Sequence, residues 1–180
     1  MLTLKHRLLI LLGLALVMAV TRMSHFGSAT VLPDASLAVF LVGGLALQSL
    51  WGFSVLMALA FGVDVISAKT AVEAGWCLTP AYWGLLPTYG LLWLAGIRLG
   101  RQGRFDLFTV AGVSLAAVCG AFVISNAFWY GLSNTVTDLS ALEYATAVAK
   151  YFPPYLGSAF LYLAPLWVGW KLTRRSSLAA

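Results

Sequence analysis

The chain has 180 residues, of which 61% are hydrophobic and 9% are charged, whereas an ordinary soluble domain carries about 25% charged residues. With so few charges and a mean hydropathy of +0.91, the composition excludes a water-soluble globule and predicts an all-α integral membrane protein with one transmembrane domain, residues 1–180. The net charge is +5, but the basic residues that produce it are scattered over separate short segments. This pattern does not indicate nucleic-acid binding.

Apolar runs separated by short polar segments predict the membrane helices. The run at 35–63 is too long for one crossing, because a helix of that length would span about 44 Å against a hydrocarbon core of about 30 Å. Gln48, Ser49 and nearby Gly52 are the expected place for a hairpin within it. The sequence therefore predicts six transmembrane helices, at about 8–22, 35–48, 51–66, 82–98, 107–130 and 154–171.

The distribution of basic residues favours six crossings over five, because basic residues gather in cytoplasmic loops. With six helices one side holds Lys5, Arg7, Arg98, Arg101, Arg104, Lys171, Arg174 and Arg175, and the other side holds Arg22, Lys69 and Lys150. We therefore expect both termini in the cytoplasm, and the longer outer loops at 23–34, 67–81 and 131–153.

The last outer loop is expected to contain a short surface helix. Apolar residues recur at helical spacing between Thr137 and Lys150, and Pro153 and Pro154 follow before the last crossing. Function concentrates in loops that a rigid scaffold holds, so the outer side is the expected place of a functional site.

Sequence motifs of several functional classes are missing. The chain has no G-x-x-x-x-G-K-[ST] loop, so any ATP would be hydrolysed by a partner. It has no H-E-x-x-H and no C-x-x-C either, which argues against a zinc metalloprotease of that kind and against a thiol oxidoreductase.

Six crossings bring four reactive side chains to the outer side: His25, Asp64, Cys77 and Tyr82. A free thiol on an oxidising side of a membrane is a liability unless it is used, and Cys77 is therefore a candidate metal ligand, the alternative being a small buried hydrophobe. His25 suits a metal ligand, a donor to an anionic ligand or an interfacial polar residue. Asp64 is expected to line a cavity, or else to pair locally with Lys69.

Other residues carry weaker signals. Cys119 at mid-membrane is expected to be an inert packing residue. Ala15 and Ala19 on the first helix form a small-xxx-small pair that lets another helix approach closely. The outer aromatics belong to the interfacial belt or line a pocket for a large, partly apolar ligand: Phe26, Trp76, Tyr82, Trp83, Trp129, Tyr130, Tyr151 and Tyr155.

Six helices, no ATPase motif, Ala15-x-x-x-Ala19 and an outer site together resemble the S-components of energy-coupling-factor (ECF) vitamin transporters. The order and setting of His25, Asp64, Cys77 and Tyr82 resemble, more narrowly, the cobalamin-specific BtuM family. The resemblance covers the whole chain as topology and is most specific at Cys77 and at the Ser24-His25-Phe26 segment before it.

The resemblance implies uptake of cobalamin (vitamin B12) across a bacterial inner membrane by a transport protein that is not an enzyme. Cys77 would be an axial ligand to the cobalt, while His25, Asp64 and Tyr82 would shape the pocket. Ala15 and Ala19 would dock on the transmembrane subunit of an ECF module, which also has two ATPases, or the chain works without such a module. A thiolate on the upper face of the ring would displace cyanide from cyanocobalamin.

Three alternatives stay open from the residues alone. In the first, the chain is an S-component for another vitamin or for haem, and Cys77 is incidental. In the second, it is a membrane-embedded acyl-transfer enzyme, with Cys77 as nucleophile, His25 as base and Asp64 as orienting acid. In the third, it is a structural subunit of a larger complex, which predicts no small-molecule binding.

Overall fold

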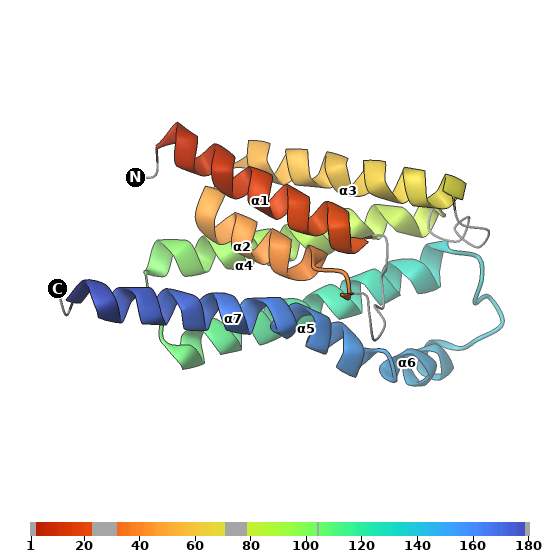
Figure 1. Cartoon of the computed structure of the whole chain (residues 1–180). Helices are drawn as coiled ribbons and strands as arrows, with labels where there is room; N and C mark the ends of the chain where they lie inside the picture. Colours follow the sequence, from red (N-terminus) through yellow and green to blue (C-terminus); the bar gives the residue numbers. More distant parts are fainter. Residues whose placement is uncertain (1–2, 23–31, 71–78, 104, 179–180) are drawn as a thin grey trace.

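The computed structural model describes residues 3–22, 32–70, 79–103 and 105–178. Every regular element in these ranges is a helix, and Figure 1 shows the long helices running side by side, with the start of the first and the end of the last at the same end of the bundle. In chain order they are α1 (Leu4–Arg22), α2 (Ser36–Leu47), α3 (Leu50–Thr70), the 3-10 helix η2 (Pro80–Gly84), α4 (Leu85–Gln102), α5 (Leu107–Leu132), α6 (Ala141–Ala149) and α7 (Phe152–Leu178).

Three of the described helices, α1, α3 and α5, are long and apolar enough to cross a membrane. The helix α2 is also apolar but has only 12 residues. Large apolar side chains on α1, among them Leu12, Leu16 and Val20, are exposed, as expected of a surface that faces lipid and not water. These features, with the composition, support a helical membrane protein; six crossings and the orientation of the termini stay predictions.

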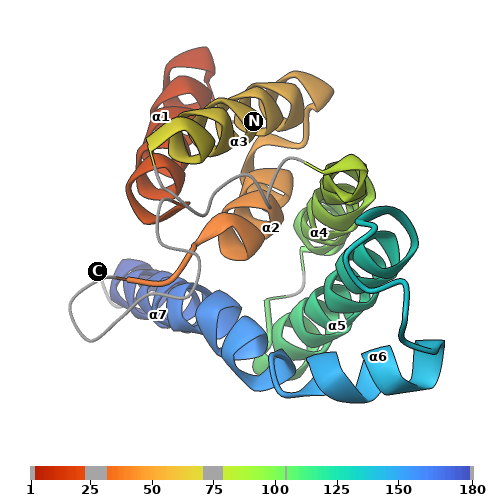
Figure 2. The ribbon, with the colours of Figure 1, turned by 90° about the vertical axis from the view of Figure 1, so that its right-hand side faces the viewer.

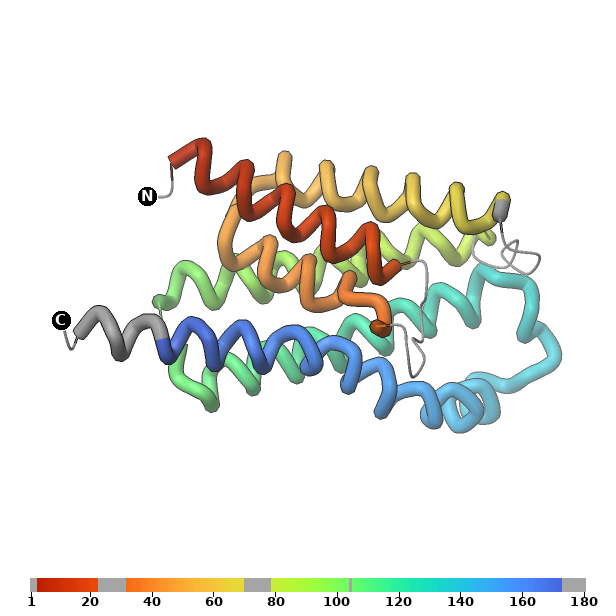
Figure 3. The backbone as a smooth tube through the Cα atoms, viewed as in Figure 1, coloured from red at the N-terminus to blue at the C-terminus, as the bar shows by residue number. Residues whose placement is uncertain are grey.

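The chain breaks between α2 and α3 where the sequence predicts a hairpin. Gln48 adopts a left-handed conformation (φ 49°, ψ 34°) directly after the last residue of α2, and α3 begins at Leu50. Figure 3 shows this turn at the end of the bundle that also holds the two termini. The long apolar run therefore folds back on itself as two antiparallel helices.

The helix α2 lies among α1, α3, α4 and α7 (Figure 2). Most of its residues are buried. A helix that is buried on all sides must be apolar on all sides, and apart from Ser36 at its start α2 is. Its backbone approaches α4 closely: a Cβ atom on Gly44 would overlap the carbonyl of Trp93, and one on Gly96 would overlap the carbonyl of Leu41. Glycine at these positions lets the two helices touch through their backbones.

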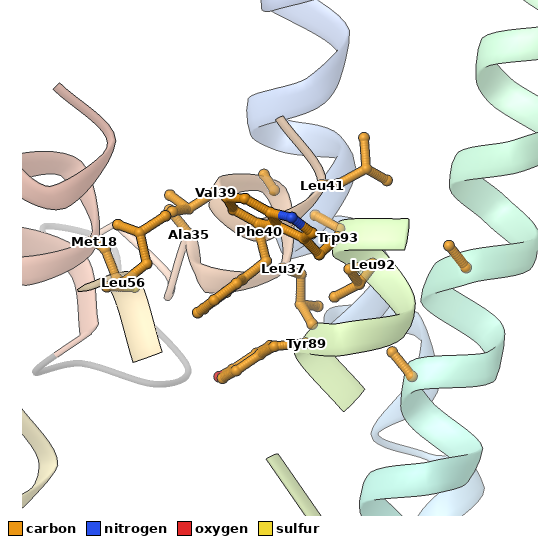
Figure 4. Packing of buried hydrophobic residues seen from close by; sticks show 14 of the residues in the cluster. Met18, Ala35, Leu37, Val39, Phe40, Leu41, Leu56, Tyr89, Leu92 and Trp93 are labelled. Atoms are coloured by element: carbon orange, nitrogen blue, oxygen red, sulfur yellow. The ribbon is translucent and has the colours of Figure 1, made fainter. Parts of the chain in front are cut away.

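Aromatic rings fill the core between α2, α3 and α4 (Figure 4). The Phe40 ring stacks on the Tyr89 ring, with centroids 4.2 Å apart, and the Phe53 and Trp93 rings pack edge-on nearby. Offset and edge-on ring pairs contribute about 0.5–1.5 kcal/mol each beyond the area that they bury. This aromatic cluster holds Tyr89 in place beside the candidate site.

Several helix bounds differ from those expected, because hydropathy marks the apolar part of a helix and not its end. The helix α3 continues past Asp64 and Lys69 to Thr70, and α7 continues past Lys171 to Leu178. The expected start of the fourth helix at 82 falls inside η2, and α4 begins at Leu85.

The surface helix expected between 137 and 150 is present as α6, Ala141–Ala149. It begins with a capping box, in which the Ser140 side chain accepts from the Glu143 backbone N–H and the Glu143 carboxylate accepts from Ser140. Pro153 and Pro154 lie in the first turn of α7, where the missing N–H costs no helical hydrogen bond.

Candidate functional site

A cavity of about 450 Å³ lies at the end of the bundle where α1, α3 and α5 end and where α2, α4 and α7 begin. Its volume is within the range typical of small-molecule sites, about 300–1,000 Å³. Polar side chains from α1, from α3 and from the residues just before α2 line one side, and aromatic and polar side chains from α5 and α7 line another. The lining includes Arg22, Asp34, Asp64, Tyr82, Thr88, Tyr89, Phe122, Ser125, Asn126, Trp129, Tyr151, Tyr155 and Ser158.

The central polar contact of this site joins α1 to α3. The Arg22 guanidinium donates from Nε to Asp64 Oδ1 at 2.8 Å and from Nη2 to Asp64 Oδ2 at 2.7 Å. The two side chains are only 2% and 4% exposed. This paired geometry matches the planar fork of guanidinium to the two oxygens of a carboxylate, which is the strongest arrangement that the pair offers.

The remaining nitrogen of Arg22 binds α2 and α4. Nη1 donates to Ser36 Oγ at 2.7 Å, to the Tyr89 hydroxyl at 2.8 Å and, at 3.4 Å, to Asp34 Oδ2. Ser36 Oγ in turn donates to Asp34 Oδ1. One buried side chain at the end of α1 therefore binds three other helices, and these partners make its buried charge tolerable.

Tyr82 brings η2 into the same network. Its hydroxyl donates to Asp64 Oδ2 at 2.8 Å, and the edge of its ring packs against Phe61 with the ring centroids 5.8 Å apart. Two of the four candidate residues, Asp64 and Tyr82, thus lie in contact and line the cavity. Both oxygens of Asp64 are engaged.

The local alternative for Asp64, a pair with Lys69, is wrong, because the carboxylate pairs with Arg22 instead. In the sequence, Arg22 stands out only as a basic residue of the outer side. A basic residue directly at the end of an apolar run is the sign that points to it. No feature of the neighbouring sequence identifies its partner, which lies 42 residues further along the chain.

His25 and Cys77 lie outside the described residues. Some described residues near these two segments in the chain line the cavity: Arg22 directly precedes the first segment, and Pro33 and Asp34 follow it closely. Ala81 and Tyr82, shortly after the second segment, also line the cavity.

The opposite wall of the cavity is aromatic and carries one side-chain amide. The edge of the Tyr155 ring packs on Phe122 with centroids 5.2 Å apart. Asn126 donates to the Phe122 carbonyl, and its oxygen accepts from the Tyr144 hydroxyl of α6 at 3.1 Å. The surface helix is therefore tied to the cavity wall through Asn126.

The structure separates the described outer aromatics into two groups. Tyr82, Trp129, Tyr151 and Tyr155 line the cavity. Trp83 and Tyr130 do not line it; Trp83 is 74% exposed and Tyr130 is 36% exposed, as expected of rings in the interfacial belt. Sequence alone does not distinguish neighbours such as 82 and 83, because their side chains differ only in direction.

The remaining candidates lie elsewhere. Cys119 is half-buried in α5 and does not line the cavity. Ala15 is half-buried and packs against the core cluster, and Ala19 is also half-buried, so both flank the exposed apolar face of α1. Among the described residues, no three His, Cys, Asp or Glu side chains lie together as a metal site.

No family model matches the chain, and no curated protein matches it.

Proposed function

We propose that this protein takes up cobalamin, or a related corrinoid, across a bacterial inner membrane. The ligand enters the cavity from the periplasmic side, and reorientation in the membrane releases it into the cytoplasm. One observation carries the proposal: Asp64 and Tyr82 line the cavity, and so do Arg22, directly before the segment that contains His25, and Ala81, three residues after the segment that contains Cys77.

The chemistry of the cavity suits a large, partly apolar ring with amide substituents. The Phe122, Trp129 and Tyr155 rings supply an apolar wall, and Ser125 and Asn126 supply hydrogen-bonding groups beside it. Such a mixture, with mostly apolar lining and few convergent polar groups, is typical of small-molecule sites. A corrin ring presents apolar faces and amide-bearing edges. The aromatic wall would contact the faces, and the polar groups beside it would contact the amides.

In this proposal the Cys77 thiolate is the axial ligand to cobalt. The reaction with cyanocobalamin is a ligand exchange, in which a Co–S bond forms, the Co–C bond breaks and cyanide leaves with the electron pair of that bond. The cobalt stays Co(III), so no oxidant or reductant is needed. Tethering the thiol beside the pocket removes much of the entropic cost of this step.

The network around Arg22 supports a pocket role for Asp64 and Tyr82. Arg22 holds the carboxylate through two hydrogen bonds, and Tyr82 holds the second oxygen. A ligand therefore meets a polar surface that is already ordered, which lowers the entropic cost of binding.

For inward release, we propose that α1 contacts the transmembrane subunit of an ECF module around Ala15 and Ala19, or that the protein works without a module. The chain has no nucleotide-binding loop, so ATP would act only through such a partner. Reconstitution of the protein alone in vesicles, with labelled cobalamin outside, separates the two modes of transport.

The test of the proposal is the absorption spectrum of corrinoid bound to the purified protein. Wild type is expected to show a thiolate-type shift and to release cyanide from cyanocobalamin. Cys77→Ala should abolish both, whereas Cys119→Ala, which removes the other thiol away from the cavity, should leave both unchanged.

Other results would point to the alternatives. A bound corrinoid with unchanged spectrum and cyanide still attached would overturn the cobalt ligand. Thermal stabilisation by haem or another vitamin, but by no corrinoid, would favour an S-component of different specificity. Reaction of Cys77 with an activity-based thiol probe, without protection by corrinoid, would favour the enzyme.

A further inference from the structure

A second hollow, a groove of about 400 Å³, lies between α4 and α5 and shares no lining residue with the first cavity. Its apolar walls include Leu91 and Leu94 of α4 and Val113 and Ala116 of α5, and Arg98 is the charged residue that lines it. The groove is open to the surface of the helix bundle, because Leu94 and Ala116 are both exposed.

The groove runs along the bundle from the end that holds the termini toward the middle. Arg98 lies in the last turns of α4, which ends at Gln102, and Val113 lies near the start of α5 at Leu107. Leu91, at mid-helix, marks the other end of the groove. A charged group therefore lies at the head of the groove, and apolar side chains continue from it toward the centre of the bundle.

No carboxylate pairs with Arg98 in the part of the chain that the structure describes. The acid at this end, Asp106, caps α5 by accepting from the Thr109 backbone N–H at 2.9 Å. Arg101, one turn further along α4, is also exposed but does not line the groove. The head of the groove thus offers a guanidinium with its donors available.

We propose that this groove binds an anionic phospholipid, with one acyl chain along its apolar walls and the phosphate-bearing headgroup on Arg98. Guanidinium matches phosphate oxygens with two parallel donors, and basic pockets between membrane helices bind anionic headgroups on the cytoplasmic side. A second protein helix is the poorer occupant, because it would bury Arg98 without a partner, which is costly at membrane depth.

Native mass spectrometry of the full-length protein, titrated with lipids of identical acyl chains, tests the headgroup contact. Wild type is expected to bind phosphatidylglycerol about fivefold more tightly than phosphatidylcholine, since one basic residue near the membrane surface is worth about 1 kcal/mol. Arg98→Gln should remove this preference. Arg101→Gln makes the same charge change outside the groove and should retain it.

A matched pair of variants tests the groove itself. Ala116→Leu places a larger side chain in the groove and should weaken both lipids, whereas Ala127→Leu, on an exposed part of α5 outside the groove, should weaken neither. Equal losses in Arg98→Gln and Arg101→Gln would indicate general charge attraction and overturn the proposal. Unchanged binding in Ala116→Leu, or equal affinity of wild type for both lipids, would overturn it as well.

Discussion

Arg22 and Asp64 lie side by side through two hydrogen bonds of 2.8 and 2.7 Å, although 42 residues separate them in the chain. Both side chains are almost fully buried, and each satisfies the other. The pair forms only if the last turn of α1 lies beside Asp64 of α3, so it tests the packing of the two helices directly.

Removal of one partner of this pair is expected to destabilise the protein strongly. Arg22→Gln or Asp64→Asn leaves an uncompensated buried charge, which costs about 3–5 kcal/mol. The double variant leaves no such charge and should lose less than the sum of the single losses. Unfolding midpoints in one detergent measure this, with the exposed Arg101→Gln as control. Additive losses would contradict a direct pair.

The Tyr82 hydroxyl is expected to matter for ligand binding through Asp64. Tyr82→Phe keeps the ring at the cavity but removes the hydrogen bond to Asp64 Oδ2. A hydrogen bond to a charged group contributes about 1.5–3 kcal/mol, so corrinoid affinity should fall by about tenfold or more. Absorption titration with aquocobalamin measures it. Trp83→Phe, on the exposed neighbour, is the control, and equal affinities of the two variants would contradict the role.

Gly96 is expected to tolerate no side chain. A Cβ there would overlap the backbone of α2 at Leu41, so Gly96→Ala must push two helices apart, and overpacking of this kind costs about 1–3 kcal/mol. At Gly62 a Cβ meets nothing within 4 Å, so Gly62→Ala should be neutral or stabilise α3 by about 0.5–1 kcal/mol. Thermal unfolding of both variants measures the difference; an equal effect would argue against the close approach.

The capping box of α6 predicts a pH dependence. Hydrogen bonds from the Ser140 side chain and backbone lower the pKa of Glu143 below its ordinary value of 4.5. Because the folded-state pKa is the lower one, the stabilisation is present above the ordinary pKa and is lost as the pH falls through the lowered value. The protection factors of α6 amides, in which the intrinsic pH dependence of exchange is divided out, should therefore fall as the pH drops below 4.5 and through the lowered pKa of Glu143.

Ser140→Ala checks the cause of that dependence. Without the cap, α6 amides should exchange faster already at neutral pH, and the pKa of Glu143 should return toward its ordinary value. The buried amides of α2, which has no titratable side chain, serve as the internal control. If the protection factors of α6 amides in wild type are the same at pH 3 and pH 7, the capping box does not hold this helix.

Local patterns in the sequence predicted part of this structure. The hairpin at Gln48 and Ser49 followed from the length of a hydrophobic run, and the surface helix α6 followed from periodic apolar residues. Both features depend on residues that are close together in the chain, so the sequence alone was enough to predict them. That Asp64 lines a cavity followed from the cost of a charge in a membrane.

The rest depended on contacts between distant segments. Arg22 as the partner of Asp64, the separation of Tyr82 from Trp83, and the close approach at Gly96 all depend on how helices are rotated against one another. Hydropathy carries no information on that rotation for helices that are apolar on most faces. His25 and Cys77 lie outside the described residues, so their roles stay predictions.

The position of Arg22 has a consequence for motion of α1. As the last residue of α1, it is bonded to α2, α3 and α4 at once. A rotation of α1 about its own axis would move the guanidinium out of the plane of the Asp64 carboxylate. It would lengthen all of these hydrogen bonds together. Any torque applied to α1 from outside the protein would therefore be transmitted to the cavity wall, and a ligand that stiffens the wall would resist that torque.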